Sequence, residues 1–262
     1  MALVKTDDGV AIEYEVYGSG SLTLLFLHGW GNAASFWDDL LTNHLDLTGL
    51  RCVTVSFRGH GDSDKPLGGY NHDQFAKDMF TVADAVVAAK IVIVAFSMAT
   101  KFALYMSAVE PTRVLGQVLL APVGPREYPA PRELLSSWVD TAPHPERMRD
   151  LLAPFIKRPF RRELMDLYCE NVTKATRAAL EGTNEMWAYT SVEEHVKSVR
   201  VPTLVVGGEA DALLPPEYVQ NEVVALIIGS RSITMPCGHD IPLEMPNETA
   251  WVIQAFLAGL HR

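Results

Sequence analysis

The fold of this chain is decided by the stretch Ile91-Val92-Ile93-Val94-Ala95-Phe96-Ser97-Met98-Ala99-Thr100. Its first four residues are β-branched and apolar, which predicts a buried parallel strand. The residues after Ser97 have the pattern of an amphipathic helix, so the serine sits where a strand turns sharply into a helix. Such a turn lifts the side chain out of the sheet and leaves the first N–H groups of the helix unpaired beside it. Ser97 is therefore a candidate catalytic nucleophile.

The residues that flank this turn are Ala95 and Ala99, whereas the usual pattern around such a serine is G-x-S-x-G. Alanine is the smallest alternative to glycine, so the sharp turn stays possible, with tighter packing or some backbone strain. An ordinary serine that begins a helix is the alternative interpretation, and this stretch alone leaves it open.

Three further predicted strands end in turns with residues that could assist Ser97. They are Leu22–Leu27 before His28–Asn32, Val201–Val206 before Gly207–Asp211, and Ser232–Met235 before Pro236–His239. Because the carboxyl ends of parallel strands meet at one edge of a sheet, these turns should lie close together. The order serine, acid, histidine along the chain predicts a catalytic triad of Ser97, Asp211 and His239. The backbone N–H groups of Trp30 and Met98 are the predicted oxyanion-hole donors.

This arrangement resembles the α/β-hydrolase superfamily over nearly the whole chain. Further matching stretches are Phe57–Ser63, Pro111–Val114 followed by Val118–Ala121, and Gly238–Pro246. Within the superfamily, His28-Gly29-Trp30 together with Phe96-Ser97-Met98 looks most like the bacterial aryl esterases and cofactor-free haloperoxidases, also called perhydrolases. The chain departs from the family pattern at Ala95, Ala99, Lys101 and Ser56.

The resemblance also helps to choose among the polar residues near the strand ends. The family's G-x-x-D spacing favours Asp211 over Glu209 as the triad acid, and Glu209 lies nearer the strand. We expect His28 to brace the oxyanion turn by hydrogen bonding and His60 to be a turn residue. Cys237 lies two residues before His239 but has no sharp strand-to-helix turn, so we interpret it as a structural residue.

The rest of the chain predicts an α/β fold with a mostly parallel sheet and helices on both faces. Val10–Tyr17 alternates in polarity and predicts an antiparallel edge strand. Six further strands, near residues 22–27, 52–56, 91–95, 115–121, 201–206 and 231–235, alternate with helical segments.

The exception to this alternation is a long segment with helical patterns and no convincing strand. The patterns cover Glu133–Thr141, Glu146–Phe155, Arg161–Asn171 and Thr173–Trp187. We expect residues 1–124 and 200–262 to form the hydrolase core and residues 125–199 to form an inserted helical cap over the pocket. Candidate substrate contacts in it are Trp138, Phe155, Tyr168, Met186 and Trp187, although such residues on helices are more often core.

Composition indicates which binding partners and which cellular location to expect. The 262 residues carry a net charge of −10, and the absence of a basic stripe argues against nucleic acid. The first residues lack the pattern of a signal peptide, and no run approaches the roughly 20 apolar residues of a membrane span. We expect a soluble cytoplasmic protein with a small-molecule substrate. The three cysteines show no paired spacing and no cluster has zinc-ligand spacing, so we expect no disulfide, metal or cofactor.

These residues predict a serine hydrolase that transfers an acyl group from a carboxylic ester or lactone to water. The same constellation can also cleave carbon–carbon bonds in diketone-like compounds, or form peracids with peroxide. A ligand receptor that keeps the fold without turnover is the alternative from another class, and the alanine-flanked turn keeps it open.

Overall fold

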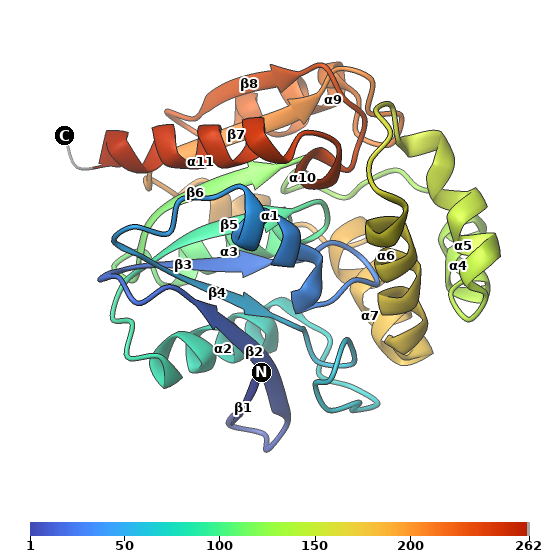
Figure 1. Cartoon of the computed structure of the whole chain (residues 1–262), viewed down its shortest axis with the longest axis horizontal. Coiled ribbons are helices and arrows are strands. Elements are labelled where there is room, and N and C mark those ends of the chain that lie inside the picture. Colours follow the sequence, from blue (N-terminus) through green and yellow to red (C-terminus); the bar gives the residue numbers. More distant parts are fainter. Residues whose placement is uncertain (261–262) are drawn as a thin grey trace.

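Eight strands form one sheet in the computed structural model, which describes residues 1–260 (Figure 1). The strand order is β1-β2-β4-β3-β5-β6-β7-β8, and every neighbouring pair from β4 to β8 is parallel. The strands are β1 (Ala2–Lys5), β2 (Ala11–Tyr17), β3 (Leu22–Leu27), β4 (Leu50–Val55), β5 (Ile91–Phe96), β6 (Val114–Leu120), β7 (Thr203–Gly208) and β8 (Arg231–Met235). The mostly parallel α/β sheet predicted from the sequence is confirmed.

The central strands are continuous aliphatic runs because both of their faces are covered. Every residue of β5 is buried, and the same holds for β7. In register, Leu27 of β3 lies opposite Ala95 of β5, and Phe96 lies opposite Leu120 of β6. The chain segments that follow β3, β5 and β6 therefore emerge at one edge of the sheet.

The amino-terminal edge differs from the prediction. The segment β2 is antiparallel as expected, but it is not the edge strand, since β1 pairs with it on its outer side. The strand β1 has only four residues and its side chains are largely exposed, so it has no hydrophobic pattern that the sequence could reveal.

Helices cover both faces of the sheet, as predicted. Figure 1 shows α1 and α11 in front of the sheet and α2 and α3 behind it. The core helices are α1 (Asp38–Asn43), α2 (His72–Ala85), α3 (Ala99–Val109), α9 (Pro216–Glu222), α10 (Ile241–Glu244) and α11 (Pro246–Leu260). No helix within residues 1–260 is both long and apolar enough to cross a bilayer.

Between β6 and β7 the chain forms an inserted group of helices beyond the carboxyl ends of the strands (Figure 1). They are α4 (Arg132–Thr141), α5 (Pro145–Leu152), α6 (Arg162–Lys174), α7 (Arg177–Ala188) and α8 (Glu193–Val196). The helical pattern predicted over Thr173–Trp187 divides in two. Its first residues end α6, and Thr176 adopts an extended conformation and accepts a hydrogen bond from Ala179 N–H to begin α7.

Two segments at the base of these helices, residues 125–130 before α4 and residues 188–192 at the junction of α7 and α8, are called the neck below. Hydrogen bonds join the two segments directly: Tyr128 N–H donates to Ala188 O (2.7 Å), and Val192 N–H donates to Pro125 O (2.8 Å). The two segments of the neck are thus paired with each other.

Candidate active site

Ser97 lies at the sharp turn between β5 and α3 and has a positive φ of 54°. A non-glycine residue in this region stores about 1–3 kcal/mol of strain and persists only where its surroundings hold it. Here Ser97 N–H donates to Leu120 O (2.9 Å), and the Thr100 hydroxyl donates to Ser97 O (2.5 Å). Thr100 in turn accepts a hydrogen bond from Val123 N–H, so the turn is fixed from both sides. The alanines at positions 95 and 99 are compatible with this geometry.

A chain of hydrogen bonds joins Ser97 to the two other residues of the predicted triad. His239 Nε2 lies 2.9 Å from Ser97 Oγ, and His239 Nδ1 lies 2.8 Å from Asp211 Oδ2. Asp211 Oδ1 accepts hydrogen bonds from Leu213 and Leu214 N–H, each at 2.9 Å. All three side chains are buried, whereas Glu209 is exposed and has no contact with His239. The structure therefore brings Asp211, rather than Glu209, against the histidine.

The groups around Asp211 and His239 favour an ionised aspartate beside a basic imidazole. Burial pushes the pKa of Asp211 upward, but His239 and two backbone N–H groups outweigh it, and the net pKa is lowered. Burial likewise pushes the pKa of His239 downward, but Asp211 outweighs it with help from Asp240 and Glu244, and the net pKa is raised above 6.5. The imidazole is therefore a stronger base than a free histidine.

The predicted oxyanion donors belong to two turns that pack against each other. A side chain at Gly29 would lie 2.8 Å from the Phe96 ring and 3.5 Å from Ser97 Cβ, so only glycine lets the turn after β3 approach the serine this closely. Within residues 1–260, neither Trp30 N–H nor Met98 N–H donates to a protein acceptor. Two unpaired donors beside the Ser97 turn fit a site for a developing negative charge.

His28 braces the first of these turns and has no contact with the triad. Its Nδ1 lies 2.7 Å from Gly29 O, and its Nε2 accepts a hydrogen bond from Phe57 N–H (3.2 Å). This pair of bonds fits the neutral tautomer with the proton on Nδ1, and burial holds the pKa of His28 well below its usual value. His60 is also buried, and burial lowers its pKa to about 4. Its Nδ1 contacts Arg58 O in the turn that follows β4.

The loop that carries His239 is organised by Glu244, a residue that sequence analysis did not single out. Its carboxylate accepts hydrogen bonds from four backbone N–H groups, those of Lys157, Arg158, Gly238 and Asp240, at 2.6–3.1 Å. The first two belong to the inserted segment and the other two flank His239. Phe155 O also accepts a hydrogen bond from His239 N–H (2.8 Å). The histidine loop and the insertion are thus held together by one buried carboxylate.

A small cavity of about 30 Å³ reaches Ser97 and His239. Its other lining residues are Trp30, Trp138, Leu151, Leu152, Phe155, Tyr168 and Leu213. Three predicted substrate contacts, Trp138, Phe155 and Tyr168, therefore share this cavity with the serine. Met186 and Trp187 do not line it. They are buried on α7, where the Trp187 indole donates to Asn184 Oδ1 (2.9 Å).

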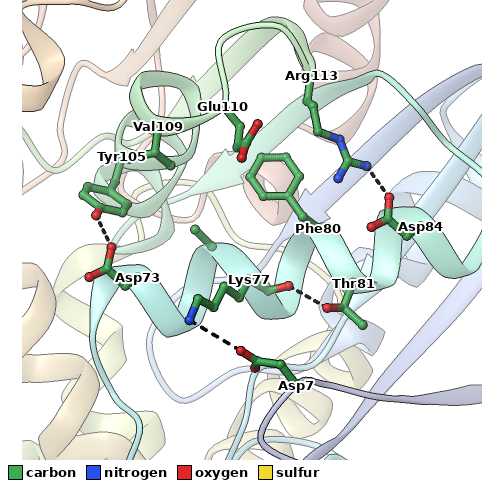
Figure 2. Close-up of a pocket in the computed structure, with 11 residues that line it drawn as sticks. Asp7, Asp73, Lys77, Phe80, Thr81, Asp84, Tyr105, Val109, Glu110 and Arg113 are labelled. Atoms are coloured by element: carbon green, nitrogen blue, oxygen red, sulfur yellow. Dashed lines mark hydrogen bonds and ion pairs between the residues drawn. The ribbon is translucent and has the colours of Figure 1, made fainter.

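A larger cavity, of about 430 Å³, lies away from these residues between α2 and α3 (Figure 2). Figure 2 shows three pairs among its lining residues: Asp84 with Arg113, Lys77 with Asp7, and Asp73 with Tyr105. It contains no histidine and no serine. Size therefore does not identify the reactive site in this molecule.

The remaining candidate groups do not form a second reactive centre in the described part of the chain. Burial raises the pKa of the Cys237 thiol to about 12, which disfavours the nucleophilic thiolate. Cys52, Cys169 and Cys237 are all free. Among residues 1–260 no group of three or more His, Cys, Asp or Glu side chains is arranged to hold a metal ion.

Comparisons with known proteins find similar sequences and folds among the hydrolases. Residues 24–250 match the model of the alpha/beta hydrolase family. A bifunctional esterase/perhydrolase from Acinetobacter calcoaceticus is 25% identical, with both chains covered completely. The structure of the esterase EaEST from Exiguobacterium antarcticum superimposes with a TM-score of 0.88 at 20% identity, covering 98% of both chains. An enol-lactonase from Burkholderia xenovorans LB400 gives 0.84 at 17% identity, covering 98% of this chain and 100% of the other. At these identities the structural matches establish the fold alone.

Proposed function

Because the chain belongs to the alpha/beta hydrolase family, we propose that it is a serine hydrolase that cleaves a carboxylic ester or lactone through an acyl-enzyme intermediate. The observation that carries the proposal is the continuous hydrogen-bond chain from Ser97 through His239 to Asp211, with Ser97 held at positive φ. Nucleophile, base and orienting acid are already within hydrogen-bond reach of one another.

In the first half of the reaction Ser97 Oγ attacks the carbonyl carbon of the ester. His239 Nε2 takes the hydroxyl proton, and Asp211 stabilises the imidazolium that forms. Trp30 and Met98 N–H donate to the oxyanion of the tetrahedral intermediate, and each such donor contributes about 3–4 kcal/mol in other serine hydrolases. The intermediate collapses when His239 returns its proton to the departing alcohol, which leaves the acyl group on Ser97.

In the second half water takes the place of the alcohol. His239 removes a proton from the water, whose oxygen attacks the acyl carbon, and the same two N–H groups bind the second oxyanion. Collapse of this intermediate returns the proton to Ser97 Oγ and releases the carboxylic acid. For a lactone substrate the alcohol and the acid are parts of one product molecule.

The cavity beside Ser97 favours compact, uncharged substrates. Apart from His239, its lining contains no carboxylate, lysine or arginine, and aromatic and leucine side chains predominate. Trp138 packs edge-on against Trp30 (5.7 Å between ring centroids) and close to Phe155 (5.9 Å). A charged acyl group would lose its hydration in this cavity without gaining a partner. We therefore expect short, neutral acyl groups to be preferred.

A receptor on the same fold would need the cavity but not the hydrogen-bond chain. A serine held at positive φ lowers stability, and catalysis is the function that requires it beside an aspartate–histidine pair. The alanines at positions 95 and 99 do not prevent the strained turn, so the feature that left the receptor interpretation open carries little weight.

Hydrolysis of p-nitrophenyl acetate by wild-type protein and by Ser97→Ala tests this function. Ser97→Ala should lower kcat by several orders of magnitude without altering the unfolding temperature by more than a few degrees. Ser137→Ala on the exposed surface of α4 is the matched control and should keep the wild-type rate. Equal rates in wild type and Ser97→Ala would remove Ser97 from the mechanism.

A further inference from the structure

Lys101 is a buried cation on α3, one turn after the nucleophile. Its Nζ donates hydrogen bonds to two backbone carbonyls, Arg126 O at 2.6 Å and Thr190 O at 2.8 Å. Lysine is almost never fully buried unless it is paired. In the part of the chain that the structure describes, no carboxylate lies within ion-pair distance of this ammonium group. Burial of an ammonium group without a carboxylate partner is costly, so packing alone does not account for a lysine in this position.

The two carbonyls belong to opposite segments of the neck. Arg126 lies in the segment that runs from β6 to α4, and Thr190 lies in the segment between α7 and α8. The segments already bond to each other through Tyr128 N–H and Val192 N–H, but these bonds do not attach the neck to the core. Tyr128, Thr190 and Arg126 of the neck each bond to one core residue, namely Leu213, His72 and Glu222. Lys101 differs from these contacts because one side chain of the nucleophile helix bonds to both segments.

The position of the neck matters for the cavity. The segment that runs from β6 continues into α4, whose Trp138 lines the cavity beside Ser97. The same segment carries Tyr128, whose hydroxyl donates to Leu213 O (2.7 Å), and Leu213 N–H donates to the Asp211 carboxylate. A shift of the neck relative to α3 would therefore move the cavity wall, whereas Leu214 N–H and His239 would still hold the Asp211 carboxylate.

We propose that Lys101 is a positioning residue that holds the neck on the nucleophile helix and thereby sets substrate affinity. The kinetic consequence rests on the proposed ester hydrolysis, whereas the structural consequence does not. Substrate affinity should respond more than the chemical step, because the Lys101 side chain bonds only to the neck and to neither the triad nor the oxyanion donors.

The strength of this attachment should depend on pH. Burial lowers the pKa of Lys101 to about 7, against a small opposing effect of Glu127. Above that pH the neutral amine still carries N–H donors, but charge-assisted hydrogen bonds are about twice as strong as neutral ones. The charged and titratable groups that act on Lys101 are Glu127 in the neck and His72 on α2. Around His72 lie Asp73 on the same helix, Tyr105 on α3 and His195 on α8.

Two of these neighbours keep their charge state through the neutral range. Burial, assisted by the Lys101 charge, lowers the pKa of His72 to about 4, and its Nε2 contacts Thr190 Oγ1. Burial and Asp73 raise the pKa of Tyr105 to about 12. Comparing a Lys101 variant with wild type at each pH cancels the titration of the remaining groups and of His239.

The test compares Lys101→Met with wild type, with Lys65→Met as the control, since Lys65 donates to Gly61 O within the core and not to the neck. Near pH 6, Lys101→Met should raise KM for p-nitrophenyl acetate about tenfold with little change in kcat, the loss expected for a charged hydrogen bond. The ratio of variant to wild-type KM should shrink as pH rises above about 7. An unchanged KM, a loss confined to kcat, or a ratio independent of pH would overturn the proposal.

Hydrogen exchange gives a readout that does not need activity. In Lys101→Met the amides of Tyr128 and Val192 should exchange about tenfold faster than in wild type, whereas amides of β5 should not change. If wild type cleaves no ester, the proposed function fails and exchange still decides the role of Lys101. Should Lys101→Met not fold, Lys101→Gln, which keeps two N–H donors without the charge, takes its place, and its Tyr128 and Val192 amides should exchange faster than in wild type. Wild-type exchange in the neck of either variant would overturn the proposal.

Discussion

Asp211→Asn is the substitution for which the structure makes the sharpest prediction. Asp211 Oδ1 accepts hydrogen bonds from Leu213 and Leu214 N–H, so an asparagine must keep its carbonyl oxygen at that position. Its NH₂ group then faces His239 Nδ1, which must become an acceptor. The imidazole proton moves to Nε2, where it faces Ser97 Oγ, and the histidine can no longer accept the serine proton.

This inverted tautomer should lower kcat about 10⁴-fold, as the equivalent change does in another serine hydrolase. The loss corresponds to about 5.4 kcal/mol of transition-state stabilisation. The assay is initial-rate hydrolysis of p-nitrophenyl acetate at saturating substrate, with circular dichroism to confirm folding.

Glu209→Gln is the matched control, because Glu209 lies two residues away, is exposed and has no contact with His239. It should keep the wild-type rate within about twofold, as expected for a surface substitution. A mild effect of Asp211→Asn together with a large effect of Glu209→Gln would refute the assignment of the acid.

Three further predictions address the base, the cavity and the histidine loop. His239 must be neutral to accept a proton, and its pKa is raised, so kcat/KM should fall as pH falls through a midpoint above 6.5. A midpoint well below 6.5 in the pH–rate profile would contradict the proximity of Asp211. Trp138→Ala should raise kcat/KM for p-nitrophenyl octanoate relative to the acetate by about tenfold or more, since contacts of a few methylene groups with a pocket are worth about 1–3 kcal/mol. An unchanged ratio would remove Trp138 from the cavity wall. Glu244→Gln should lower both kcat/KM and the unfolding free energy, because the NH₂ group of the glutamine must face at least one of four backbone N–H donors. The unfolding free energy, measured by urea denaturation, should fall by about 2 kcal/mol or more. Wild-type stability would show that these bonds contribute little.

Local sequence patterns were sufficient to predict most of the fold. The strand β5 could be recognised because a parallel strand covered on both faces is a continuous aliphatic run. The strand β1 could not, because it is short and exposed and is defined by its antiparallel partner β2. The order of strands in the sheet likewise depends on contacts that no local pattern records.

In the candidate site, too, only the residues with a local sequence pattern could be predicted. Ser97, Asp211 and His239 could be predicted because each follows a recognisable strand and carries a reactive side chain. The roles of Glu244 and Lys101 could not, since their partners are backbone groups far away in the chain. Sequence alone marked Lys101 only as a departure from the family pattern.

Helical periodicity also left the orientation of the inserted helices open. Trp138 and Trp187 both lie on amphipathic helices with buried faces. Only the packing of α4 and α7 decides that Trp138 faces the cavity beside Ser97 while Trp187 does not. A pattern of apolar residues identifies a buried face, but it does not say which neighbour covers that face.

The most direct test of the account is covalent labelling with a fluorophosphonate, which reacts with a serine only when a neighbouring base activates it. Labelled protein would be digested, and the modified peptide would be identified by mass spectrometry. The account predicts a single adduct on Ser97 that is absent in Ser97→Ala and forms much more slowly in Asp211→Asn. An adduct on another residue, or ester hydrolysis by a protein whose Ser97 remains unmodified, would contradict it.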